Sequence, residues 1–222
     1  LGLDIVCLDP VYPEFIGRLP DPAEVCWADL GDWVNTGLFS FAVLDGVLGW
    51  GIKCFGFNQF LTLPNKSPLS IHSFTEKVTS LNIEMAGRLI DAGIDGLIIA
   101  DDLAYRRGLL IKPRDMRRYV FSALQSQVAE MRRGGVPVFI HSDGNINEII
   151  PDIIEAGFNG LHCIDRNSSM DILELQRNYG DRLCFWGSLS AEDLIKAHDP
   201  GCLQGLLDTI CATAAKNGFI LG

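Results

Sequence analysis

The sequence predicts an α/β fold, a (β/α)8 TIM barrel that is incomplete at one or both ends of the 222 residues. Two observations support this prediction: strand-like and helical segments alternate along the chain, and two of the resulting units are near copies of each other. The strand-like segments are continuous apolar runs, as expected for parallel strands that are covered on both faces. An open doubly wound sheet is the alternative, but no G-x-G-x-x-G follows any of these strands.

From about residue 85 onward, each unit is an amphipathic run that ends in glycine, followed by a short apolar run. Glycine at such a position predicts a left-handed residue that ends a helix. The five glycines concerned are Gly93, Gly135, Gly157, Gly180 and Gly218. The near copies, "DAGIDGLIIAD" (91–101) and "EAGFNGLHCID" (155–165), share an A-G-x-x-G-L core, and both end in aspartate.

Two further strands are predicted earlier, in "LDIVCL" (3–8) and "LFSFAVL" (38–44). Long helical patterns occupy 68–92 and 114–134, and Pro113 stands at a helix start, where its missing amide hydrogen costs nothing. The pattern contains seven strands in total, and the remaining strand of the barrel is expected outside the given residues.

Composition argues against several classes of protein. A formal charge of −10 and a pI near 4.8 disfavour nucleic acid and anionic membrane surfaces as partners. The longest apolar stretch, "GLFSFAVLDGVLGWGI", is too short and too interrupted to span a bilayer, and no signal peptide is recognised. The seven cysteines contain no C-x-x-C and lack the spacing of a disulfide framework, which favours a reducing, cytoplasmic compartment.

The polar residues that follow the strands are rich in acids and histidines. In a parallel barrel the C-terminal ends of all strands face one end, here called the mouth, so the residues that follow them converge there. In chain order they are Asp9, Asp45, Asp101 and Asp102, His141 and Asp143, His162 and Asp165, and Ser188. Their concentration predicts an active site at the mouth.

The stretch "FIHSDGN" (139–145) contains the most specific candidates. His141 and Asp143 face the same side if the strand continues, which suits two ligands of a divalent metal or an imidazole polarised by a carboxylate. The alternative is ordinary helix capping by Asn145, with Glu148 completing an N-x-x-E pattern. Both interpretations can hold, because Asn145 can cap a helix while His141 and Asp143 remain available.

The aspartates after the first and third strands have structural alternatives. Asp9 precedes Pro10, a pattern that is also typical of a turn. Asp101 and Asp102 are adjacent and point in opposite directions, so only one of them can face the mouth.

His162 lies inside an apolar strand and is as compatible with a core histidine as with a site residue. The pair Arg106–Arg107, in "YRRG" after the third strand, is placed to receive a carboxylated substrate. A solvated loop is the alternative for this pair.

Several stretches together resemble the uroporphyrinogen decarboxylase superfamily. They are "LIIADDLAYRRGLLIKPRDMRRYV", "VPVFIHSDGNINEIIPDIIEAGFNGLHCID", "SMDILELQRNYGDRLCFWGSL" and "NGFILG". The superfamily contains tetrapyrrole decarboxylases and methyltransferases that deliver methyl groups to corrinoid proteins or coenzyme M. The resemblance covers nearly the whole chain in order, and it implies that residues 1–222 form a single (β/α)8 barrel domain.

The resemblance implies different site residues for the two activities. The zinc methyltransferases carry H-x-C at the end of the fourth strand; His141 matches the histidine, whereas Asp143 stands in place of the cysteine. The decarboxylases use an aspartate after the first strand, which Asp9 matches, and they act without a cofactor. They also carry a tyrosine after the second strand, and residues 45–60 contain none.

The favoured function is therefore a methyltransferase that moves a methyl group from a small methylated substrate to a corrinoid protein, with zinc as a candidate metal. The alternatives are uroporphyrinogen decarboxylase, acting on a carboxylated tetrapyrrole, and a barrel that only binds a ligand. A homodimer is left open. The predicted residues are Asp9, Asp102, His141 and Asp143 for catalysis, Asp101, Arg106, Arg107, His162 and Asp165 for substrate binding, and His141 and Asp143 for the metal.

Overall fold

Seven parallel strands form one sheet in the computed structural model, which describes residues 5–8 (backbone only), 18–215 and 218–222. The strands are β1 (Ile5–Leu8), β2 (Phe39–Asp45), β3 (Gly96–Ala100), β6 (Val138–His141), β7 (Gly160–His162), β8 (Cys184–Gly187) and β9 (Phe219–Leu221). They pair in chain order, and every neighbouring pair is parallel. This is the arrangement of a (β/α)8 barrel that lacks one strand, so the predicted fold class is confirmed.

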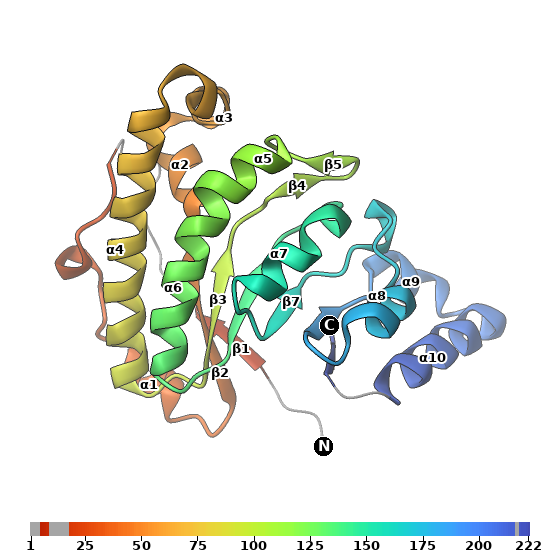
Figure 1. The fold of residues 1–222 in the computed structure, drawn as a ribbon. Coiled ribbons are helices and arrows are strands. Elements are labelled where there is room, and N and C mark those ends of the chain that lie inside the picture. Colours follow the sequence, from red (N-terminus) through yellow and green to blue (C-terminus); the bar gives the residue numbers. More distant parts are fainter. Residues whose placement is uncertain (1–4, 9–17, 216–217) are drawn as a thin grey trace.

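Helices cover the outer face of this sheet. Figure 1 shows α4, α6, α7 and α8 following one another from left to right in front of the strands. The helices are α1 (Leu30–Val34), α2 (Val47–Phe55), α3 (Phe57–Lys66), α4 (Pro68–Ala92), α5 (Pro113–Asp115), α6 (Ser122–Arg133), α7 (Ile150–Glu155), α8 (Ile172–Tyr179), α9 (Ala191–Lys196) and α10 (Pro200–Ala214). A π-helical stretch, Met116–Phe121, joins α5 to α6, so the helical pattern predicted at 114–134 is continuous.

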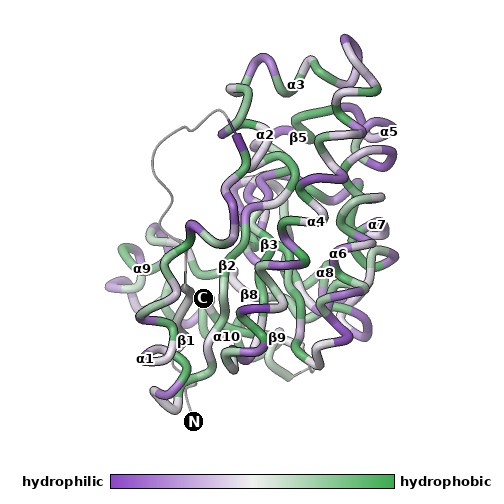
Figure 2. Tube along the Cα trace, turned by 90° about the vertical axis from the view of Figure 1, so that its left-hand side faces the viewer, coloured by the Kyte–Doolittle hydropathy of each residue, from purple (hydrophilic) through white to green (hydrophobic). Residues whose placement is uncertain are grey.

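The strands alternate between two cores because successive side chains point to opposite faces. The larger core lies between the sheet and the helices, and Figure 2 shows hydrophobic residues along the strands with hydrophilic residues on the outer helices. The smaller core fills the barrel interior with Phe41, Ile98, Phe139 and Trp186. Gly160 leaves room for this packing, because a Cβ there would lie 2.2 Å from the Phe139 ring.

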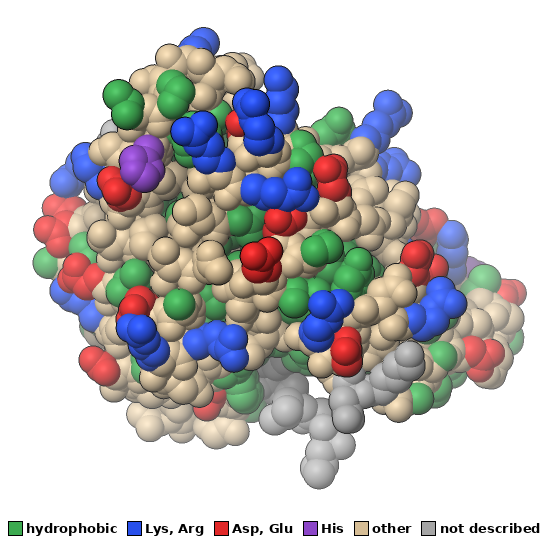
Figure 3. All heavy atoms as spheres, viewed as in Figure 1, with side chains coloured by type: hydrophobic (Ala, Val, Ile, Leu, Met, Phe, Trp, Pro, Cys, Tyr) green, Lys and Arg blue, Asp and Glu red, His purple; other side chains and the backbone are tan. Residues whose placement is uncertain are grey.

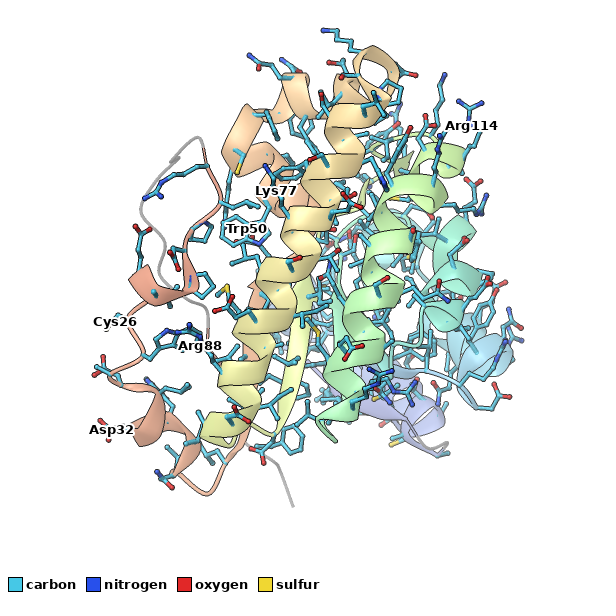
Figure 4. All side chains as sticks on the ribbon, turned by 60° about the vertical axis from the view of Figure 1, so that its left-hand side comes forward. Cys26, Asp32, Trp50, Lys77, Arg88 and Arg114 are labelled. Atoms are coloured by element: carbon cyan, nitrogen blue, oxygen red, sulfur yellow. The ribbon has the colours of Figure 1, made fainter. Side chains whose placement is uncertain are left out.

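Two side chains labelled in Figure 4, Trp50 and Arg88, connect α4 with the part of the chain that precedes it. Trp50 projects from α2, and its indole nitrogen donates to Asn82 Oδ1 of α4 at 3.3 Å. Arg88 projects from α4 toward the segment that contains Cys26, and its guanidinium lies 5.9 Å from the centre of the Trp27 ring. Within the described residues, no helix is long and apolar enough to cross a membrane.

Four of the five glycines predicted to be left-handed have φ between 80° and 99°: Gly93, Gly135, Gly157 and Gly218. The prediction is wrong for Gly180, which is right-handed with φ −67°. Glycine is needed there for a different reason, because a Cβ would lie 2.6 Å from the Gln176 carbonyl oxygen.

Candidate active site

The register of three neighbouring strands aligns His141, His162 and Trp186 at the mouth. His141 is two residues after Phe139, so it shares the inward-facing side of β6. Its Nδ1 lies 2.8 Å from Nδ1 of His162, and the two ring centres are 4.8 Å apart. On the other side of the His162 ring, the ring centres of His162 and Trp186 are 4.6 Å apart. The His162 ring is therefore held between two neighbouring rings.

Asp102, His141 and Asp143 form a cluster, here called the donor cluster. One nitrogen or oxygen atom from each residue lies within 4.8 Å of the others. His141 Nε2 is 3.6 Å from Asp102 Oδ1, and the Asp143 amide donates to the same oxygen at 3.2 Å. Two carboxylates this close repel each other, so the cluster favours a cation between them. Because Asp102 and Asp143 are exposed, an ion could reach them from solvent.

The environment of the donor cluster keeps His162 neutral. Burial, followed by the charge of His141, lowers the pKa of His162 to about 4, with Asp143 acting in the opposite direction. A neutral imidazole carries one N–H donor and one acceptor nitrogen. His162 can therefore form a single directed hydrogen bond with His141 and does not repel a second charge.

Cys163 was not predicted as a site residue, yet it lies beside the donor cluster. Burial, the charge of Asp143 and a hydrogen bond with Asp143 raise the pKa of Cys163 to about 11, and Asp165 and Asp102 act in the same direction. At neutral pH Cys163 is thus a thiol rather than a thiolate. Its place directly after a predicted site histidine was the only signal in the sequence.

A two-stranded hairpin, β4 (Ala104–Tyr105) and β5 (Gly108–Leu109), stands over the mouth and carries Arg106 and Arg107 in its turn. Lys and Arg side chains stand out at the upper right of Figure 3, where Figure 1 places this hairpin. The loop after β6, residues 142–146, is here called the donor-cluster loop. It packs directly against the hairpin, since the Asn145 amide donates to the Tyr105 carbonyl at 3.0 Å. Gly144 permits this approach: its φ is +83°, and a Cβ there would lie 2.7 Å from the same carbonyl oxygen.

A cavity of about 400 Å³ opens beside the donor cluster. Its lining includes four predicted site residues, Arg106, Asp143, His162 and Asp165, together with Cys163 and Ser188. Arg106 Nε donates to the Asn167 carbonyl at 3.0 Å, which holds the guanidinium near the cavity. Asp165 accepts from the Asn167 amide at 2.9 Å and from the Ser168 hydroxyl, so this carboxylate also orders its own loop.

Asp101 lies away from the cavity, although the sequence predicts that it binds substrate. Its side chain is 0% exposed and packs against the start of α2, where the Gly49 amide donates to Oδ1 at 2.9 Å. A Cβ at Gly46 would lie 2.3 Å from the Asp101 Cγ, so the start of α2 packs directly against this buried side chain. The substrate-binding role of Asp101 is corrected on this ground to a structural one at the α2 N-terminus.

Burial raises the pKa of Asp101 to about 7, although the amides of Gly49, Leu48 and Val47 act to lower it. The folded chain therefore keeps a proton that the unfolded chain loses above pH about 4. We expect the free energy of unfolding to fall as pH rises from about 4 to 7, by up to roughly 1.4 kcal/mol per pH unit. Asp101→Asn should flatten this dependence in urea denaturation, whereas Asp91→Asn, at an exposed position, should not. Parallel profiles for all three proteins would contradict this.

Three other predictions have mixed outcomes. Asp9 lies outside the described residues. Arg107 is exposed in the hairpin turn and does not line the cavity described above. The N-x-x-E capping box is wrong, because Asn145 Oδ1 accepts from the Asn147 amide two residues on, and the helical turn after it has no side-chain cap.

A parallel barrel with ionisable side chains gathered at the C-terminal ends of its strands has the architecture of barrel enzymes. A comparison with family profiles matches residues 51–222 to Uroporphyrinogen decarboxylase (URO-D). This match covers most of the chain, and the chain belongs to the uroporphyrinogen decarboxylase family. The resemblance inferred from the sequence motifs is confirmed.

The curated relatives include both kinds of enzyme. A methylcobamide:CoM methyltransferase, MtaA, of Methanosarcina barkeri is 29% identical over 140 residues, which are 60% of this chain and 39% of the relative. A uroporphyrinogen decarboxylase of Chlorobium phaeobacteroides is 25% identical over 181 residues, 81% of this chain and 45% of the relative. The chain thus spans less than half the length of these two relatives, and their identities do not decide between the two activities.

A solved structure described as a methyltransferase from Methanosarcina mazei superposes with a TM-score of 0.62 at 20% identity. The match covers 83% of this chain and 59% of that one. This likeness supports the barrel fold.

Proposed function

We propose that this chain is the catalytic barrel of a methyltransferase that moves a methyl group from a small methylated substrate to a corrinoid protein. The observation that carries the proposal is the donor cluster, whose imidazole and two carboxylates meet within 4.8 Å. It lies next to a cavity of about 400 Å³, a size that suits a small ligand. The methylcobamide:CoM methyltransferase of M. barkeri is a relative that also transfers a methyl group, with methylcobamide as the donor in its case.

The donor cluster fits a divalent metal ion such as zinc. Zinc lies about 2.0–2.2 Å from histidine nitrogen and aspartate oxygen, so two ligand atoms of one ion are at most about 4.4 Å apart. The observed limit of 4.8 Å requires only a small movement of the exposed Asp102 and Asp143 side chains. Three protein ligands also leave a coordination position for substrate. When bound, the metal would supply a Lewis acid to the substrate atom that carries the methyl group.

The remaining residues hold and orient the substrate. The Arg106 guanidinium has N–H groups beyond the one bonded to Asn167, and these can pair with an anionic group on the substrate. Asp143 belongs both to the donor cluster and to the cavity lining, so it marks the point where the two meet. The methyl group would leave through the mouth, the end of the barrel at which the donor cluster and the cavity lie.

The second candidate function is decarboxylation of a tetrapyrrole without a cofactor. It is favoured by the decarboxylase relative, which matches 81% of this chain. The aspartate that this reaction would use, Asp9, lies outside the described residues. The donor cluster gives the methyltransferase the stronger support, because a metal-free decarboxylation has no use for three converging metal donors.

Methyl transfer is tested with the purified protein, zinc, a Co(I) corrinoid and a panel of small methylated alcohols, amines, ethers and thioethers. Transfer moves CH3⁺ to Co(I), giving methyl-Co(III), and leaves the bonding electron pair on the substrate heteroatom. We expect the Co(I) spectrum to be replaced by the methyl-Co(III) spectrum, with the change abolished by a chelator and restored by zinc. Turnover of uroporphyrinogen III by metal-free protein, with no methyl transfer, would contradict the proposal and establish decarboxylation.

A further inference from the structure

We infer that His162 is a positioning residue: its Nδ1 accepts a hydrogen bond from His141 Nδ1–H and thereby aims His141 Nε2 at the carboxylates of the donor cluster. This inference rests on the proposed function for its metal, but the hydrogen bond itself belongs to the protein alone. It differs from the substrate-binding role that the sequence predicts for His162.

The geometry of the pair supports this role. The two Nδ1 atoms are 2.8 Å apart, a distance at which one must donate and the other accept. Nε2 of the same ring lies 3.6 Å from Asp102 Oδ1, so it is the nitrogen that faces the carboxylates of the donor cluster. A metal on Nε2 requires the proton on Nδ1, so His162 must be the acceptor.

The sheet fixes the acceptor in place. His141 and His162 are direct partners in the register of β6 and β7, and the Ser142 amide donates to the His162 carbonyl at 2.8 Å. The next strand contributes Trp186, whose ring centre is 4.6 Å from that of His162 and limits rotation of the imidazole. Histidine ligands of metals usually donate their second nitrogen to such a fixed acceptor, and loss of the acceptor typically lowers metal affinity about 10- to 100-fold.

Two variants whose side chains have the same branched shape separate positioning from other roles. In His162→Asn, the amide Oδ1 can stand near the place of Nδ1 and still accept from His141, whereas His162→Leu has no acceptor. We expect Co(II), used as a spectroscopic probe, to bind His162→Asn within a few-fold of wild type and His162→Leu about 10- to 100-fold more weakly. Thermal unfolding and circular dichroism verify that both variants fold.

A direct substrate contact would give a different pattern. His162→Leu would then raise KM for the methylated substrate while Co(II) affinity stayed at the wild-type value. That result would overturn the inference.

Nitrogen-15 NMR of the imidazoles keeps the inference testable even if the metal proposal fails. In metal-free protein we expect a proton on His141 Nδ1 in wild type and His162→Asn, and its loss or rapid exchange in His162→Leu. If no variant binds Co(II) but this pattern holds, the proposed metal site is wrong and the positioning role stands. An unprotonated His141 Nδ1 in the wild type would overturn the positioning role directly.

Discussion

His141→Ala is expected to remove the metal and almost all activity. The substitution deletes the only nitrogen ligand of the donor cluster and leaves two exposed carboxylates, which bind zinc poorly by themselves. We expect zinc to fall from about one ion per chain to a small fraction of that. The rate of methyl transfer should fall by about 10³-fold, equivalent to about 4 kcal/mol of transition-state stabilisation.

His72→Ala is the matched control for this measurement. His72 lies on α4, its side chain is 66% exposed, and its described partner is Glu76 of the same helix. This variant should keep wild-type zinc content and activity. Stoichiometric zinc in His141→Ala, measured by elemental analysis after dialysis, would contradict the assignment of His141 as a ligand.

Gly144→Ala is expected to weaken both the fold and the site. The residue has φ +83°, which strains an alanine, and the new Cβ would collide with backbone atoms of Ala104 and Tyr105 at 2.7–2.8 Å. Backbone cannot move aside as a flexible side chain can, so the loop that carries Asp143 must shift. We expect the free energy of unfolding to fall by about 2–4 kcal/mol, together with a loss of Co(II) affinity.

Gly135→Ala measures the cost of a left-handed alanine without the steric collision that occurs at Gly144. Gly135 has φ +81°, but a Cβ there would meet nothing within 4 Å, so only the cost of the left-handed backbone remains, about 1 kcal/mol. Urea denaturation of both variants therefore measures the contribution of the close approach to the hairpin. Equal losses of stability in the two variants would show that the hairpin does not constrain the donor-cluster loop.

The barrel could be predicted because its units repeat a local pattern. Each glycine after an amphipathic run ends a helix, and each apolar run after it forms a strand, so neither step depends on distant contacts. The helix α2 was missed for the opposite reason: Gly49 and Gly51 disfavour a helix locally. A Cβ at Gly51 would lie 2.2 Å from the Phe60 ring, so tertiary packing requires glycine there.

The candidate site could be predicted as a set of residues but not as a set of contacts. The strand ends identified Asp102, His141 and Asp143, since parallel strands bring their C-terminal ends together. The structural role of Asp101 depends on α2, which the sequence did not reveal. The pairing of His141 with His162 depends on the register between two strands, and register is set by packing across the sheet rather than by either strand alone.

The proposed function depends on one metal ion that Asp102, His141 and Asp143 would hold at the mouth of the barrel. Anomalous diffraction at the zinc absorption edge, from crystals of zinc-loaded protein, tests it most directly. We expect a single strong peak about 2.0–2.2 Å from His141 Nε2 and from one carboxylate oxygen of each aspartate. A zinc peak bound elsewhere, with the donor cluster empty in zinc-saturated crystals, would contradict it.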